Sequence, residues 1–473
     1  MNLLGKNLIK KVFCILFLVF SAANLFSEYN SKGIPDSAEI RRTLVREWFT
    51  CPVSELKTKD SRVIENNIGQ RFQVRMEERL DSYVIIVSPE NIMKVKVITD
   101  DGYEFIKSPV YSEGACGSFV LYRNKVNGAP QKIQWFFNAD SEVYLEFYPS
   151  GAKTYVDLVI YSCYAIRKVS VPLGSTFDRL YTASFNDIYR WTSSIVPWEK
   201  VTVVPGQYKE MLLMSILISK ELPKIKYFDQ GCYNEDDTLC SIFTAKPIVL
   251  KDSDGNDYYP DTKGMLWLDS EGFLKWIIDG IVKPISGTKL KIEDITRPTV
   301  NYNEISKNGV LSQDWSLSFS LDVVRNLASC ALDVRSYGMY EEPFKMVDVA
   351  ANYFVGMKKS NLKPNTFFYM KDIGYKIEML NGLLYVLANI EPSYFYLAAI
   401  RNSSNVKAEE FVFNQSAILF PYFDDNGHFD CVVFEKGKEY SFSDFIKLHP
   451  GTYIHLERVK STEYFFLNDD DIE

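Results

Sequence analysis

The stretch "LWLDSEGFLKW", Leu266–Trp276, decides how the second half of this chain is expected to fold. Three polar residues stand directly before a dense apolar run. Asp269 or Ser270 can accept a backbone N–H as the N-cap of a helix, and Glu271 suits the positive end of the helix dipole. The stretch therefore predicts the start of an α-helix.

The helix that follows is expected to be buried. Lys275 and Asp279, four residues apart, form its one polar stripe. A helix that is apolar nearly all round lies inside its domain, and Pro284 is expected to end it. The apolar positions are Phe273, Leu274, Trp276, Ile277, Ile278, Ile281 and Val282.

Length and composition bound the possibilities. With 473 residues, the chain is long enough for two or three domains. Hydrophobic residues make up 47% and charged residues 24%, a composition typical of globular proteins. The net charge is −8, and no basic stripe is visible, so binding to nucleic acid through phosphate neutralisation is excluded as the main role.

The N-terminus has the features of a secretory signal peptide. Lys6, Lys10 and Lys11 precede the short apolar run Val12–Phe20, and small residues follow it. The run is too short for a comfortable membrane span. We therefore expect residues 1–27 to be a signal peptide, the protein to be exported to the periplasm or outside the cell, and no integral span to remain. Retention of this segment as an anchor is the alternative.

Cysteine usage fits export loosely. Of the eight cysteines, Cys14 lies in the signal segment, which leaves an odd number. The best candidate for a disulfide is Cys232 with Cys240, across the polar loop "GCYNEDDTLC", and the alternative is two unpaired thiols. Cys330 lies in an apolar helical pattern, which favours a buried structural thiol over a nucleophile.

Residues 28–173 are expected to form an antiparallel β-sandwich. Short segments that alternate apolar and polar residues are separated by turns such as Asn127-Gly128 and Ser150-Gly151. Such a domain could also be an interaction module with tyrosines and tryptophans exposed on one sheet face. The segments are "RFQVRMEE", "DSYVIIVS", "IMKVKVITDDGYEFI", "GSFVLYR", "KIQWFFN", "EVYLEFYP" and "TYVDLVIY".

Residues 174–473 are expected to form an α+β domain, because helical patterns come first and strands later. Ser175 is a candidate N-cap for the first helix, and Pro223 is expected to stop the second. The segment "DSDGNDYYPD", Asp252–Asp261, lacks the glycine and glutamate of a calcium loop and instead predicts a hairpin turn. The chain is thus expected to be multidomain, all-β and then α+β.

The three histidines, His428, His449 and His455, lack the spacing of a zinc site, so neither a metal nor another cofactor is expected. His428 follows the turn "DDNG" and opens the strand "HFDCVVFE". In that place it can face a cleft as a general base, or it can be an ordinary surface histidine.

With these residues in view, "LDSEGFLKWIIDG" resembles the active-site segment of the NlpC-type cell-wall peptidases, which have a papain-like fold. In that family the segment reads Asp-Cys-Ser-Gly followed by an apolar residue. Asp269, Gly272 and Phe273 match, whereas Ser270 stands where the nucleophilic cysteine belongs. "DDNGHFDCVVFEKGKEYSF" resembles the histidine segment, with His428 as the base.

The resemblance implies an NlpC-like domain with a large insertion around residues 284–385, and it departs from the family in its chemistry. Ser270 replaces a thiol, and no histidine, asparagine or glutamine occupies the strand after the His428 strand, where it could orient that histidine. We expect a degenerate, non-catalytic domain that binds peptidoglycan or an envelope protein. An active serine-type amidase or peptidase, a purely structural protein, and a plain helix start without papain-like ancestry are the alternatives.

Overall fold

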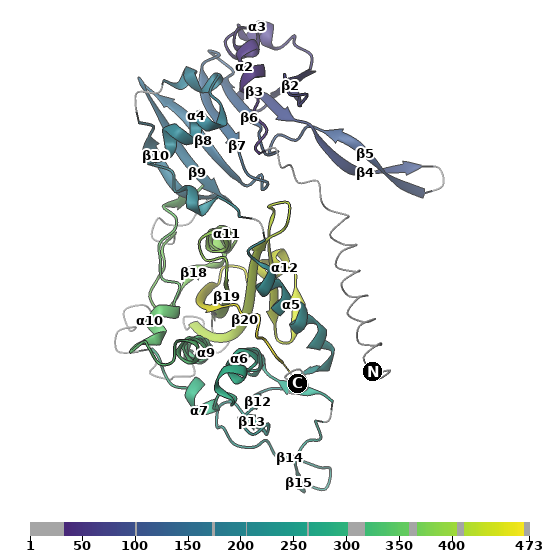
Figure 1. Ribbon diagram of the computed structural model, residues 1–473, viewed down its shortest axis with the longest axis vertical. Coiled ribbons are helices and arrows are strands. Elements are labelled where there is room, and N and C mark those ends of the chain that lie inside the picture. Colours follow the sequence, from purple (N-terminus) through teal and green to yellow (C-terminus); the bar gives the residue numbers. More distant parts are fainter. Residues whose placement is uncertain are drawn as a thin grey trace, which may run out of the picture. The chain divides into compact units, whose positions relative to one another are not determined.

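The computed structural model describes residues 33–99, 102–172, 176–204, 206–262, 264–300, 317–358, 367–403 and 411–467. The expected signal peptide with Cys14 and the expected N-cap Ser175 lie outside these residues. Within them, the mixture of a large antiparallel sheet, a second sheet and several helices confirms the expected all-β and mixed architecture (Figure 1). None of the helices in the described part is long and apolar enough to cross a membrane.

The chain forms two compact units, which are described separately. The first comprises residues up to Leu158 together with Lys168–Val196 and Phe423–His428, so it extends beyond the expected boundary at Leu173. The second comprises Val159–Arg167, Pro197–Tyr422 and Phe429–Glu473.

The strands of the first unit form a meander in one continuous sheet, with the order β1-β2-β3-β6-β7-β8-β9-β10, in which residues 159–167 at the ends of β9 and β10 belong to the second unit. The antiparallel pairing of the strands confirms the expectation. The expected sandwich would need two facing sheets, and the strands form one. Alternation of apolar and polar residues along a strand does not distinguish these two arrangements. The strands are β1 Arg62–Glu65, β2 Arg71–Glu78, β3 Ser82–Pro89, β6 Phe119–Asn124, β7 Pro130–Phe136, β8 Val143–Ser150, β9 Lys153–Ile160 and β10 Cys163–Ser170.

Helical segments before and after this sheet pack against it. The side chain of Arg41, fully buried on α2, donates hydrogen bonds to the carbonyl oxygens of Leu180, Tyr181 and Ala183 and stacks over Phe119 at 4.6 Å. This residue therefore ties the segment before the sheet to the segment after it. The helical segments are α2 Ala38–Leu44, the π-helical η1 Val45–Phe49, α3 Val53–Leu56, the 3₁₀ helix η2 Phe177–Tyr181 and α4 Phe185–Thr192.

The aromatic residues of the sheet do not form the expected exposed binding face. Trp135 is buried, and Tyr122 and Tyr144 are partly buried against a core cluster. A separate two-stranded hairpin, β4 Asn91–Thr99 with β5 Gly102–Val110, extends away from the sheet (Figure 1). We call this hairpin the arm.

The second unit is built on a six-stranded sheet of order β18-β23-β19-β20-β21-β22. The sheet contains β18 Tyr375–Lys376, β19 Tyr394–Ser403, β20 Phe411–Phe423, β21 Phe429–Glu435, β22 Lys438–Tyr440 and β23 Tyr453–Lys460. Short pairs surround it: β11 Ile225–Tyr227 with β16 Leu266–Leu268, β12 Gly231–Tyr233 with β13 Leu239–Ser241, β14 Leu250–Lys251 with β15 Asp257–Tyr258, and β17 Gly356–Met357 with the start of β10. The β14–β15 pair confirms the expected hairpin.

Two long helices, α6 Ser270–Ser286 and α9 Phe319–Ser336, pack against each other, and α9 also packs on β19 and β23. The segment expected as an insertion thus supplies part of the core. The other helices are η3 Trp198–Lys200, α5 Lys209–Glu221, η4 Leu222–Lys224, α7 Ile292–Ile295, α10 Pro343–Val347, η8 Ile377–Met379, α11 Leu380–Ile390 and α12 Phe442–Leu448.

Helix α6 is buried from Ser270 to Val282, as its sequence predicts, but it does not end at Pro284. Proline cannot donate to the carbonyl four residues earlier, which is that of Gly280. The backbone N–H of Phe466 donates to this carbonyl at 3.1 Å instead. The helix can therefore continue to Ser286, where Gly287 ends it in the left-handed conformation.

Candidate functional site

The N-terminus of α6 is held against β12 by glycine packing. The N-cap is Asp269, whose carboxylate accepts the backbone N–H of Gly272 at 2.6 Å. A Cβ on Gly272 would lie 2.2 Å from the carbonyl oxygen of Gly231, so only glycine fits there. Ser270, the first residue of the helix, is consequently buried, with 4% of its surface exposed.

Two carboxyl groups flank Ser270 in this buried position. Burial raises the pKa of Glu271, although the hydroxyl of Ser320 donates to its carboxylate at 2.6 Å and opposes the rise. Burial also raises the pKa of Asp269 well above its usual value, and the nearby charge of Glu271 adds to this effect. Two neighbouring buried carboxyls resist ionising together, so their proximity favours the protonated form of one of them.

A pocket of about 220 Å³ lies along the side of α6 and begins at Gly272. It combines aromatic walls with two cations and two anions. Its lining residues are Tyr233, Asp237, Leu266, Leu268, Gly272, Lys275, Trp276, Asp279, Lys289 and Leu467.

The polar stripe expected on α6 is a buried ion pair in this pocket. The ammonium nitrogen of Lys275 lies 2.6 Å from a carboxylate oxygen of Asp279, and the two side chains are 1% and 6% exposed. The other oxygen of Asp279 accepts the backbone N–H of Leu290 at 2.8 Å. Burial raises the pKa of Asp279, and the charge of Lys275 opposes that rise. A second pair, Lys289 with Asp237, is more exposed.

A second polar cluster surrounds His455 on β23. Its Nδ1 lies 2.6 Å from the carboxylate of Glu457, and its Nε2 lies 2.9 Å from the hydroxyl of Tyr369 and 3.3 Å from the guanidinium of Arg325. Burial lowers the pKa of His455 to about 4 and raises that of Glu457 to about 8. Both shifts favour the neutral forms of the two side chains.

Sequence reasoning placed His455 in a strand but missed this cluster. Asp348, His455 and Glu457 offer ligand atoms within 4.8 Å of one another, a spacing that suits a metal ion. The guanidinium of Arg325 already neutralises the site, however, because it lies 2.8 Å from both Asp348 and Asp372. The alternation H-x-E on one strand was the available signal, but residues 325, 348 and 372 are remote in sequence.

The two proposed catalytic residues belong to different units: Ser270 to the second and His428 to the first. His428 precedes β21 and is half-exposed, and its Nδ1 lies 3.5 Å from the carboxylate of Asp140, which raises the pKa of the histidine. His449 lies 3.1 Å from Glu435. Within the described part of the second unit, no hydrogen bond joins Ser270 to His449 or His455.

The candidate disulfide residues are neighbours. Cys232 and Cys240 lie directly opposite each other in the antiparallel β12–β13 pair, and both are buried free thiols in this structure. Cα atoms of opposite residues in such a ladder are about 4.5–5.5 Å apart, within the range that a disulfide bridges. Cys330 is a thiol on α9, and burial raises its pKa to about 11, which argues against a nucleophile.

Residues 30–200, which include the sheet of the first unit, match the model of a family described as a domain of unknown function, DUF8515. No curated protein and no solved structure matches the chain.

Proposed function

We propose that this protein is exported to the cell envelope and that its second unit is a non-catalytic, NlpC-like domain which binds the peptide part of peptidoglycan. The observation that carries the proposal is the charged pocket along α6, the helix whose first residue is Ser270. The N-terminal sequence supports export, and the segment "LDSEGFLKWIIDG" supports the NlpC-like relationship.

The chemistry around Ser270 favours binding over hydrolysis. A serine nucleophile needs a neighbouring base that takes its proton. His449 and His455, the histidines of the same unit, have carboxylate partners of their own. The groups that flank Ser270 in sequence are carboxyls that already have hydrogen-bond donors of their own, the backbone N–H of Gly272 for Asp269 and the hydroxyl of Ser320 for Glu271.

The pocket suits a ligand that carries both an amino and a carboxylate group. Lys289 and Asp237 are its more accessible charges, while Lys275 and Asp279 lie deeper and Trp276 supplies an aromatic wall. Stem peptides of peptidoglycan are short and bear charges of both signs. The charged groups of such a peptide can form ion pairs with the lysines and aspartates of the pocket, and the aromatic wall can pack against an apolar part of the peptide.

The test is calorimetric titration of the purified chain with soluble muropeptides that carry a tetrapeptide stem. We expect saturable binding that weakens at least tenfold, about 1.4 kcal/mol, in the variant Asp237→Ala/Lys289→Ala. Lys283→Ala, on the same helix but outside the pocket lining, is the matched control and should bind like the native chain. Unchanged binding in the double variant, or none in the native chain, would refute the proposal.

The same samples test for catalysis. Mass spectrometry of the recovered muropeptides should show them intact. Cleavage by the native chain that Ser270→Ala abolishes would establish the active serine hydrolase instead and overturn the non-catalytic assignment.

A further inference from the structure

The arm of the first unit exposes apolar side chains on both of its faces. Its register pairs Ile92 with Pro109 and Lys96 with Phe105 on one face, and Met93 with Ser108 on the other. The exposed fractions are 61% for Ile92, 62% for Phe105, 51% for Met93 and 42% for Ile106. A two-stranded hairpin alone is only marginally stable in water, and exposed apolar side chains mark interaction sites, so we infer that the arm binds a partner.

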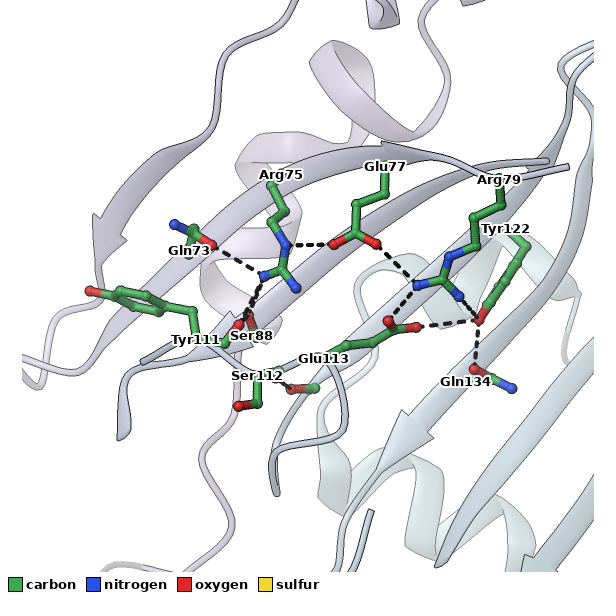
Figure 2. A network of polar contacts seen from close by, with 11 residues as sticks. Gln73, Arg75, Glu77, Arg79, Ser88, Tyr111, Ser112, Glu113, Tyr122 and Gln134 are labelled. Atoms are coloured by element: carbon green, nitrogen blue, oxygen red, sulfur yellow. Dashed lines mark hydrogen bonds and ion pairs between the residues drawn. The ribbon is translucent and has the colours of Figure 1, made fainter. Parts of the chain in front are cut away.

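The base of the arm is anchored by the polar network in Figure 2, which is drawn around β2 and the segment after β5. Arg75 on β2 donates to the carbonyl of Tyr111 at 3.0 Å and to the hydroxyl of Ser88 at 3.1 Å. Arg79 forms an ion pair with Glu113, two residues further along. Hydrogen bonds and an ion pair thus hold the chain at the base of the arm, where its two strands leave the sheet.

A further hydrogen bond joins the two ends of the arm directly. The hydroxyl of Tyr111, just after β5, donates to the carboxylate of Glu90, just before β4. Arg71 lies 2.9 Å from the same carboxylate. Polar contacts to β2 and between its two ends therefore support the base of the arm.

The charges of the arm are segregated between its faces. Lys94 and Lys107 are directly opposite each other, and Lys96 follows Lys94 on the same face, together with Ile92 and Phe105. The register places Glu104 on the other face. Like charges directly opposite are destabilising, and no ion pair of Lys94 or Lys107 occurs among the described residues. The cationic face therefore suits an anionic partner.

We propose that the arm lies in the headgroup layer of an anionic phospholipid bilayer and attaches the protein to the membrane surface. A folded protein partner would cover one face of such a ribbon, whereas a lipid interface surrounds both. Lysines can pair with lipid phosphates while the aliphatic and aromatic side chains reach the acyl boundary. The two strands have free edges, so the arm stays at headgroup level, where water still satisfies the backbone.

The experiment measures binding of the full chain to vesicles of 30% phosphatidylglycerol in phosphatidylcholine by co-sedimentation. Each lysine near an anionic surface contributes about 1 kcal/mol, so Lys94→Gln/Lys96→Gln/Lys107→Gln should weaken binding roughly 100-fold. Phe105→Ser/Ile106→Ser should also weaken it by tenfold or more. Lys153→Gln/Lys168→Gln, exposed elsewhere on the first unit, is the matched control and should bind like the native chain.

Hydrogen exchange locates the contact. Every variant carries the same N-terminal apolar segment, so a difference between them reports on the arm. Vesicles should slow exchange in peptides from residues 91–110 of the native chain and leave the lysine variant unchanged. Equal binding of native and lysine variants, or no protection in these peptides, would overturn the proposal. Protection that appears without lipid and grows with protein concentration would overturn it too, because the occupant would then be a second copy. This proposal does not depend on the pocket of the second unit.

Discussion

Removing one member of the Lys275–Asp279 pair should destabilise the second unit strongly. In Lys275→Met the carboxylate of Asp279 keeps its backbone partner Leu290 but loses its counter-ion in a nearly fully buried place. Breaking a buried ion pair in this way costs about 3–5 kcal/mol. Asp279→Leu should cost more, by about 1–3 kcal/mol, because the N–H of Leu290 also loses its acceptor.

The double variant Lys275→Met/Asp279→Leu should be more stable than Asp279→Leu alone, because no unpaired charge remains buried. The assay is urea unfolding, with a double-mutant cycle to extract the coupling free energy. The free energy of unfolding that Lys275→Met loses relative to the native chain should be larger at pH 8 than at pH 5. The folded pKa of Asp279 is then raised above its unfolded value, so the folded state loses stability as the pH rises. Additive single effects, or a pH-independent deficit, would refute the reasoning.

Three further predictions concern other positions. Between pH 6.5 and 8 the free energy of unfolding should fall by up to about 1.4 kcal/mol per pH unit, because Glu457, whose pKa is about 8, keeps a proton that the unfolded chain has released. Glu457→Gln should remove that fall in pH-dependent urea titrations; persistence of the fall would contradict the assignment. Gly272→Ala should cost several kcal/mol, because its Cβ meets a backbone oxygen, and an unchanged melting temperature would contradict the close packing. Under oxidising conditions Cys232 and Cys240 should form a disulfide, visible by mass spectrometry as a linked peptide that Cys240→Ser removes; free thiols after oxidation would contradict it.

Local sequence signals predicted the parts of the fold that depend on neighbouring residues. Apolar residues around the whole circumference of α6 implied burial, and the short polar segment before it supplied the cap at Asp269. The turn "DSDGND" predicted the hairpin β14–β15, where Asp252 accepts the backbone N–H of Asn256. In each case the deciding contacts lie within a few residues along the chain.

Contacts between distant residues were not predictable from the same signals. Ser320 meets Glu271 and Arg325 meets His455 only because α9 packs between α6 and β23. Alternation along the strands of the first unit suits one sheet covered by helices as well as two facing sheets. Pro284 predicts too early an end for α6, because the carbonyl of Gly280 accepts its hydrogen bond from Phe466, far along the chain.

The most direct test of the central claim is the equilibrium titration of the native chain with tetrapeptide muropeptides, beside the pocket variant Asp237→Ala/Lys289→Ala. We predict saturable binding by the native chain, at least tenfold weaker binding by the variant, and intact ligand recovered from both. Equal affinity of the two chains, or ligand cleaved by the native chain in a reaction that needs Ser270, would contradict it.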